Sequence, residues 1–179
     1  APLKVAAGTS SLVLSLVEAE KIDLLAMGRP EGPGCYCAAN NMLRNNIDQL
    51  GKNYDYVVVD NEAGMEHISR QTTRDVDILL IVSDPSMRGL ITAARVKDLI
   101  AELRTKVGRI ALVVNRIDNG LTPEAKRLIE QQGLDVIGLL PSEPKLSELD
   151  ARGAPVTDLP EDSPLRRGVF EIVKKLNLA

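Results

Sequence analysis

Two apolar runs decide the fold of this 179-residue chain: Ile78-Leu79-Leu80-Ile81-Val82-Ser83 and, further along, Ile110-Ala111-Leu112-Val113-Val114-Asn115. Each run is nearly continuous in Val, Ile, Leu and Ala and ends in a polar residue. Such runs are typical of strands that are buried on both faces, as in a parallel sheet covered by helices. Three more runs share this character and are expected to be strands: Ile22–Met27, Tyr56–Asp60 and Val136–Leu140.

Stretches with helical periodicity separate the runs. The sequence Thr122-Pro123-Glu124 predicts a helix start with an N-cap, a proline at N1 and a first-turn acid, and Gly133 is expected just past the end of that helix. Residues 143–162 are expected to be loops around a short helix. Three further helices are predicted from their apolar faces. The first face is Met42, Leu43, Ile47 and Leu50, and the second is Val96, Leu99, Ile100 and Leu103. The third helix is expected to start at Ser163-Pro164, with an apolar face of Leu165, Val169, Ile172, Val173 and Leu176.

This alternation predicts one α/β domain over residues 1–179, with a mostly parallel sheet between two layers of helices. Aromatic residues make up only 2%, which argues against a stacking platform for single-stranded nucleic acid. A net charge of −3 argues against a general polyanion-binding surface. No apolar run approaches the roughly 18 residues of a membrane span. With two cysteines and no secretory signal, we expect a cytoplasmic protein with reduced thiols.

Polar residues follow the predicted strands, and ligands of such sheets bind beyond the carboxyl ends of the strands. Asp60 ends one run and is followed by Ala63-Gly64, an arrangement that holds Mg²⁺ and a terminal phosphate in phosphate-handling enzymes. The alternative is an Asp that caps the next turn. Asn115 could bind a base edge through its amide, or it could simply form a turn after its strand.

The sharpest chemical signal is Cys35-Tyr36-Cys37 in a loop rich in Gly and Pro. Two thiolates can converge on one soft metal but leave its coordination shell incomplete. A twofold dimer that pairs the same loop from two subunits would supply four cysteines. The alternative is two ordinary thiols. The only histidine, His67, is more often structural than a ligand.

The last predicted helix carries Arg166, Arg167, Lys174 and Lys175 opposite its apolar face. Such a helix could lie on a membrane surface. We favour the alternative, a terminal helix packed on the sheet with a solvated basic face.

Together these residues resemble the accessory ATPases that help insert nickel into carbon monoxide dehydrogenase. That family is part of the deviant-Walker P-loop ATPases, with the septum-positioning and partition ATPases and the nitrogenase iron protein. The resemblance covers roughly residues 20 to 178. Its motifs, of which the Cys-x-Cys segment is the most specific, are Met27–Cys37 followed by Asn40, Leu43 and Arg44; Val59–His67; Asp84-Pro85-Ser86; Asn115; and Leu159–Pro164.

The resemblance implies an ATP-dependent nickel metallochaperone that acts as a homodimer, with carbon monoxide dehydrogenase as its client. Cys35 and Cys37 would bind Ni²⁺ or Zn²⁺ between subunits. Asp60 would act on Mg²⁺ and Gly64 would face the γ-phosphate of ATP. A larger set would hold the nucleotide, ATP or ADP: Asn115 and Arg116, with Pro141, Ser142 and Glu143 flanking the base.

One feature of the family's pattern is missing. No Gly-x-x-x-x-Gly-Lys-Ser/Thr loop occurs, and the chain begins after the point where the family's first strand and P-loop stand. We therefore expect catalysis to be doubtful in these residues, and the chain to be weakly stable or prone to aggregation, because loss of a central strand leaves unpaired edges. Two alternatives remain open: a positioning or partition ATPase, and a non-enzymatic fragment that binds a metal or a partner.

Overall fold

The structure, a computed structural model, describes residues 4–5, 14–20, 22–27, 45, 47, 49, 51–61, 63–64, 76–103 and 105–178. The chain divides into two compact units, Ala1–Thr73 (unit 1) and Arg74–Ala179 (unit 2). Met42, Leu43 and Leu50, expected on a helix face, lie outside the described residues, whereas Ile47 is helical.

Unit 2 is built on a three-stranded sheet in the order β4-β5-β6, with β4 at Val76–Ser83, β5 at Val107–Ile117 and β6 at Val136–Pro141. Both strand pairs are parallel. The three strands coincide with three of the predicted runs. The centre of β5 is buried from Ala111 to Val114, as expected for a parallel strand covered on both faces.

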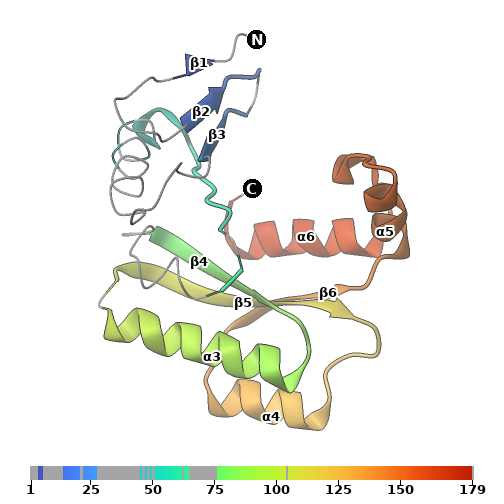
Figure 1. The fold of residues 1–179 in the computed structure, drawn as a ribbon. Helices are drawn as coiled ribbons and strands as arrows, with labels where there is room; N and C mark the ends of the chain where they lie inside the picture. The colour runs from blue at the N-terminus through green and yellow to red at the C-terminus, as the bar shows by residue number, and fades with distance from the viewer. Residues whose placement is uncertain are drawn as a thin grey trace, which may run out of the picture. The chain divides into compact units, whose positions relative to one another are not determined.

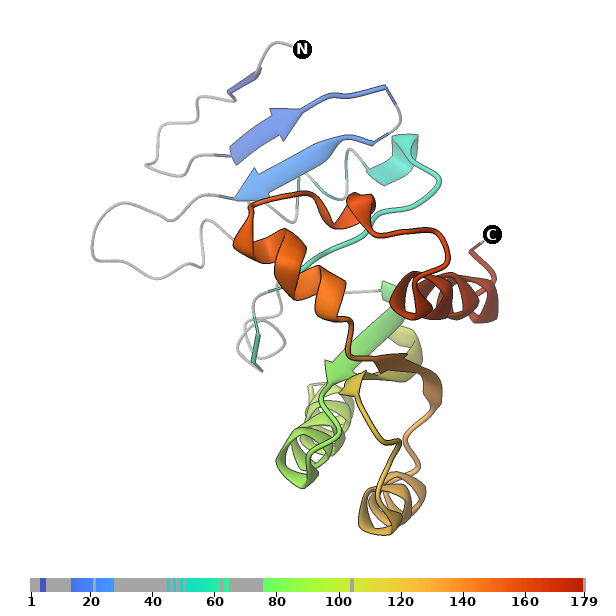
Figure 2. The same cartoon turned by 90° about the vertical axis from the view of Figure 1, so that its right-hand side faces the viewer.

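Helices cover the two faces of this sheet (Figure 1, Figure 2). The helices α3 (Met87–Glu102) and α4 (Pro123–Gln131) lie on one face and α6 (Pro164–Lys175) lies on the other. The short helix α5 (Pro144–Ala151) and a 3₁₀ turn, η2 (Val156–Asp158), connect β6 to α6. The α/β fold expected from the sequence is therefore confirmed, with parallel strands between two helical layers.

The predicted helix starts are confirmed by their capping hydrogen bonds. Thr122 Oγ1 accepts the N–H of Ala125 at 3.2 Å, and Ser163 Oγ accepts the N–H of Arg166 at 3.3 Å. A proline follows each cap at the first helical position. Gly133 has a φ of +55°, the left-handed conformation of a residue just past a helix end.

The core of unit 2 has one cluster on each face of the sheet. Between the sheet and α3 and α4 lie seven buried residues: Ile81, Leu90, Ala93, Leu112, Val114, Ala125 and Leu134. Between the sheet and α6 lie six: Ala111, Val113, Ile137, Leu140, Ile172 and Leu176. Of the apolar face expected on α6, Val169 is 45% exposed and does not join this core.

Unit 1 holds an antiparallel sheet in the order β1-β2-β3, with β1 at Lys4–Val5, β2 at Leu14–Val17 and β3 at Leu24–Met27. The run Ile22–Met27 thus forms a strand, but the expectation of parallel pairing is wrong for it. The connection from β2 to β3 is too short for a parallel crossover and suits a hairpin. A 3₁₀ turn, η1 (Gly51–Asn53), follows.

The run Tyr56–Asp60 was expected to be a buried strand, and this prediction is wrong. Residues 56–60 form no strand, and Val58 is 91% exposed. The physical reason is that an apolar run becomes a strand only where a neighbour accepts its ladder of hydrogen bonds. None of the described strands of unit 1 pairs with it.

Among the described residues, no helix is long and apolar enough to cross a membrane.

Candidate functional site

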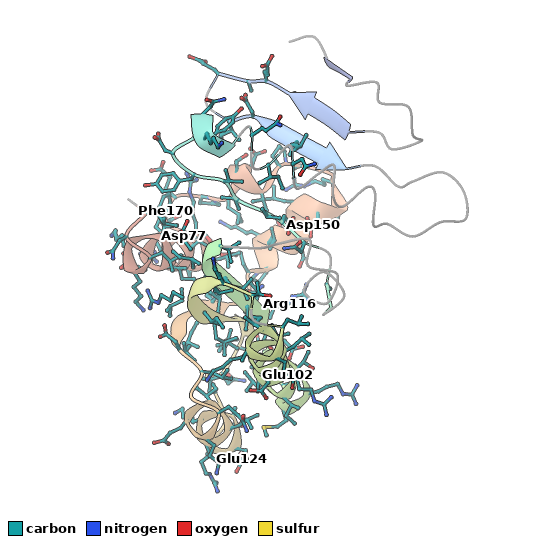
Figure 3. The ribbon with its side chains drawn as sticks, turned by 90° about the vertical axis from the view of Figure 1, so that its left-hand side faces the viewer. Asp77, Glu102, Arg116, Glu124, Asp150 and Phe170 are labelled. Carbon is teal, nitrogen blue, oxygen red and sulfur yellow. The ribbon has the colours of Figure 1, made fainter. Side chains whose placement is uncertain are left out.

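The carboxyl ends of β4, β5 and β6 lie at one edge of the sheet, because the three strands are parallel. Polar residues stand at these ends: Ser83 is the last residue of β4 and Asp84 follows it, Asn115 and Arg116 lie near the end of β5, and Ser142 follows β6. This carboxyl edge of unit 2 is the place where open α/β sheets bind ligands. Figure 3 labels Arg116, whose side chain is exposed.

Asp84 is held in a tight turn at the start of α3. Its Oδ1 accepts the N–H of Ser86 at 2.9 Å, and Ser86 Oγ accepts the N–H of Gly89 at 3.0 Å as the N-cap of the helix. A Cβ at Gly89 would lie 2.5 Å from Asp84 Oδ1, so the turn packs against the helix only because residue 89 is glycine. The sequence placed Asp84 in the Asp84-Pro85-Ser86 motif of the resemblance without a specific role, whereas Gly89 carried no signal.

The end of β5 is irregular at Asn115 and Arg116. The register with β6 shifts between Val114 and Ile117, and Arg116 has a φ of +58°. Asn115 Oδ1 accepts the N–H of Arg116 at 2.8 Å, which satisfies a backbone donor that leaves the ladder. The amide nitrogen of Asn115 has no hydrogen-bond partner among the described residues, so a donor at this edge stays open to a ligand.

Of the three residues expected to flank a base, Pro141 and Ser142 continue this edge. Pro141 is the last residue of β6 and pairs with Ile117, and the N–H of Ser142 donates to Ile117 O at 3.3 Å. Both carboxylate oxygens of Glu143 accept hydrogen bonds from residues of unit 2. Its Oε1 accepts the N–H of Lys145 at 3.3 Å, and its Oε2 accepts the hydroxyl of the buried Ser163 at 2.7 Å.

We expect Glu143→Ala to destabilise the chain by about 1–2 kcal/mol, because it leaves the buried hydroxyl of Ser163 without its acceptor. Glu143→Gln keeps an acceptor oxygen and should cost less than half as much. Urea denaturation followed by circular dichroism measures both changes. Equal losses for the two variants would contradict the hydrogen-bonding role.

In unit 1, Asp60 and Gly64 are exposed, and Gly64 has a φ of +118°, which favours glycine over any other residue. The segment that leads to Asp60 is tied to the β2–β3 connection, because the Tyr54 hydroxyl donates to Asp23 Oδ2. The Ala19 N–H donates to Asp23 Oδ1 at 2.9 Å. The hydrogen bond from Tyr54 is the main cause of a lowered pKa of Asp23, and the bond from Ala19 adds to it. The bond to Asp23 also raises the pKa of Tyr54.

The cysteine pair proposed as a metal site, Cys35 and Cys37, lies outside the described residues, as do Glu62 and His67. Within the described residues, no group of three or more His, Cys, Asp or Glu could hold a metal ion. The metal assignment therefore stays a prediction from the sequence.

The basic residues of α6 are largely engaged within unit 2. Arg166 donates to Leu159 O at 2.8 Å and Lys175 donates to Ile137 O at 2.7 Å. Lys174 forms a salt bridge with Glu171 at 2.7 Å. Because Ile172 is buried on the sheet, the predicted packing of α6 is confirmed. Its basic face is not wholly solvated as expected, because Arg166 and Lys175 donate to backbone carbonyls.

This fold is known from other proteins. No protein-family model matches the chain. The MinD cell division protein of Aquifex aeolicus superimposes with a TM-score of 0.63 at 25% identity, over 78% of this chain and 61% of MinD. The chain has the MinD/ParA fold.

Two curated relatives extend this likeness. The chain is 46% identical to an uncharacterized ATP-binding protein of Methanocaldococcus jannaschii. The matched 165 residues cover 90% of this chain and 64% of that relative. The chain is also 32% identical to the carbon monoxide dehydrogenase accessory protein CooC of Rhodospirillum rubrum. The matched 145 residues cover 77% of this chain and 52% of CooC. The homologues of the chain are thus ATP-binding proteins of the MinD/ParA type, and the chain spans between half and two thirds of the length of these two.

Proposed function

We propose that the protein is an ATP-dependent metallochaperone that assists nickel insertion into carbon monoxide dehydrogenase. The observation that carries this proposal is the 32% identity to the accessory protein CooC, in a chain that contains the Cys35-Tyr36-Cys37 signature. In this proposal Cys35 and Cys37 bind Ni²⁺ or Zn²⁺ as cargo, and the same loop of a second subunit completes the coordination shell.

The carboxyl edge of unit 2 supports the nucleotide part of the proposal. Its residues fit a nucleotide, because Asn115 keeps an open amide donor and Arg116 an exposed cation. Asn115 would bind the base edge, with Pro141 and Ser142 flanking it, while Glu143 keeps its structural hydrogen bonds. Bound ATP would supply binding energy for closing a homodimer, and cleavage of its terminal phosphoanhydride bond by water, giving ADP and phosphate, would allow the dimer to reopen.

The resemblance assigns Asp60 and Gly64, both in unit 1, to Mg²⁺ and the phosphates. Asp60 would hold Mg²⁺ through water, since a carboxylate oxygen is a ligand that this ion prefers. Gly64 would present its backbone N–H to the γ-phosphate, and its φ of +118° supports a loop whose conformation only glycine adopts without strain.

The metal proposal predicts a complete loss of specific binding on removal of both thiols. Native mass spectrometry of the chain with Ni²⁺ or Zn²⁺, with and without Mg-ATP, should give a dimer that carries one metal. The Cys35→Ser/Cys37→Ser variant should give none, because serine hydroxyls are not soft ligands. Retention of one metal per dimer in that variant would overturn the proposal.

A positioning ATPase is the second candidate, and the likeness to MinD favours it. In that case the two cysteines would have no role, and lipid vesicles or DNA would sediment the chain in the presence of Mg-ATP. The engaged cations of α6 argue against a membrane-surface role for that helix. Sedimentation with vesicles of anionic lipid, compared with the metal measurement above, separates the two candidates.

A further inference from the structure

Four charged side chains form a stripe along the outer face of α3. Arg88 and Arg95 come first along the helix, and Asp98 and Glu102 follow them (Figure 3 labels Glu102). All four residues are exposed. At 3.6 residues per turn they lie within about 80° of one another around the helix axis, on the side away from the buried residues. We call these four residues the α3 stripe.

The order of these charges opposes the helix dipole. The N-terminus of a helix carries a partial positive charge and the C-terminus a partial negative charge, so acids are favoured in the first turn and bases in the last. α3 has Arg88 in its first turn and Glu102 at its last residue, with no acid in the first turn and no base in the last. By contrast, α4 has Glu124 in its first turn, and α6 has Lys174 and Lys175 in its last.

The α3 stripe also lacks partners within the described part of the chain. The side chains of its four residues make no hydrogen bond or salt bridge with another described residue. Lys97, on another side of the same helix, does have partners, because its ammonium donates to two backbone carbonyls after α4 at 2.8 and 2.9 Å. The charges of the stripe are therefore unfavourable for the isolated helix and are not offset by the rest of unit 2.

An antiparallel copy of the same helix supplies the missing opposite charges. Its charge order is reversed, so Arg88 would lie opposite the partner's Glu102, and Arg95 within one turn of the partner's Asp98. Each ion pair occurs twice, because a twofold axis relates the two helices. A carboxylate then faces each N-terminal turn and a guanidinium each C-terminal turn, as the helix dipoles favour.

We propose that α3 is a self-association surface, through which two copies of this chain pair by antiparallel contact of their α3 stripes. Single exposed ion pairs contribute little, but here four pairs act on one contact. The side chains of Met87 and Ile91, which flank the stripe and are 41% and 40% exposed, would be partly covered by it. Since each copy contributes only one helix face, the contact is smaller than the roughly 1,600 Å² of a standard interface, and we expect a weak, reversible dimer.

This inference goes beyond the proposed function and does not rest on it. The contact uses residues of unit 2 alone and needs neither nucleotide nor metal. The test is therefore sedimentation equilibrium of the full chain without either, at about 10 μM to 1 mM. We expect a monomer–dimer equilibrium that weakens when the salt concentration is raised from about 50 mM to about 500 mM, because salt screens exposed charges.

Charge reversal tests the pairing itself. Arg88→Glu/Arg95→Glu and Asp98→Lys/Glu102→Lys should each weaken self-association at least about tenfold, because the four attractive pairs become repulsive. An equimolar mixture of the two variants should associate again, because the pairs between them are attractive. Both variants place charges in the order that the helix dipole favours, so neither should lower Tm.

The matched control reverses two exposed cations away from the stripe. Lys126→Glu/Arg167→Glu, on α4 and α6, changes the net charge as much as Arg88→Glu/Arg95→Glu does. It should change the dissociation constant less than about threefold, and it should not associate with Asp98→Lys/Glu102→Lys as the stripe variant does.

The outcomes separate this inference from the proposed function. A chain that stays monomeric throughout, a mixture that associates no better than its two components, or a control variant that behaves like Arg88→Glu/Arg95→Glu would each overturn the inference. Cys35→Ser/Cys37→Ser should dimerise like the unaltered chain, and a dimer that needs these cysteines would also overturn it. Loss of metal binding in a chain that still pairs through α3 would support the inference, whatever the metal measurement decides about the proposed function.

Discussion

Replacing Leu112 with alanine is expected to lower the free energy of unfolding by about 3 kcal/mol. Leu112 is 1% exposed at the centre of β5, the middle strand of unit 2, and its cluster includes Ile81 and Leu90. Truncation there loses the transfer free energy of the side chain and leaves a cavity that a close-packed sheet cannot fill. Because whole domains are stable by about 5–15 kcal/mol, the loss is a large share of the total.

Urea denaturation followed by circular dichroism measures this loss, and Leu139→Ala is its matched control. Leu139 lies on β6, but its side chain is 50% exposed. The same truncation there removes apolar area that water already reaches, so we expect a loss of less than about 1 kcal/mol. Similar losses for the two variants would contradict the core described for unit 2.

The parts of the fold that sequence alone predicted are those decided by local chemistry. The run Ile78–Ser83 specified a strand through its β-branched and aliphatic side chains, but the expected burial on both faces is wrong, because only Ile81 is buried while Leu80 is 42% and Val82 62% exposed. Thr122 and Ser163 specified helix starts because a hydroxyl before proline satisfies an otherwise free N–H. The capping signals depend only on residues within one helical turn, whereas the strand also required β5 as its pairing neighbour.

The errors came where a distant partner decides the structure. The run Tyr56–Asp60 has the composition of a strand, but composition does not supply a neighbour to accept its hydrogen bonds. Strand direction is equally non-local, and Ile22–Met27 became part of a hairpin because of the short connection that precedes it.

In the candidate site, too, some features could be predicted from the sequence and others could not. The strand ends with Asn115 and Ser142 were predictable, because parallel strands place their carboxyl ends at one edge. The hydrogen bond from Ser163 to Glu143 was not, since it joins residues 20 apart in the sequence. The positive φ of Arg116 carried no sequence signal, because arginine seldom adopts it and neither glycine nor proline marks the position.

The second large effect is expected at the contact between β6 and α6. An added Cβ at Gly138 would lie 2.4 Å from Ile172 Cδ1 and 2.5 Å from Ile172 Cγ1. Ile172 is 6% exposed, so its side chain has little room to move away. Gly138→Ala should therefore destabilise the chain by about 2 kcal/mol through overpacking, and Ile172→Ala by about 3 kcal/mol through a cavity.

A double-mutant cycle tests whether this contact is the cause. Ile172→Ala removes both atoms that the new methyl group would strike, so the double variant should be at least about 1 kcal/mol more stable than the sum of the single losses predicts. The control pairs Gly138→Ala with Leu176→Ala, a buried leucine at the end of the same helix that is not among the nearest atoms to the added Cβ. That pair should be additive within about 0.5 kcal/mol. Additive losses in both cycles would mean that α6 does not pack on β6 through Gly138.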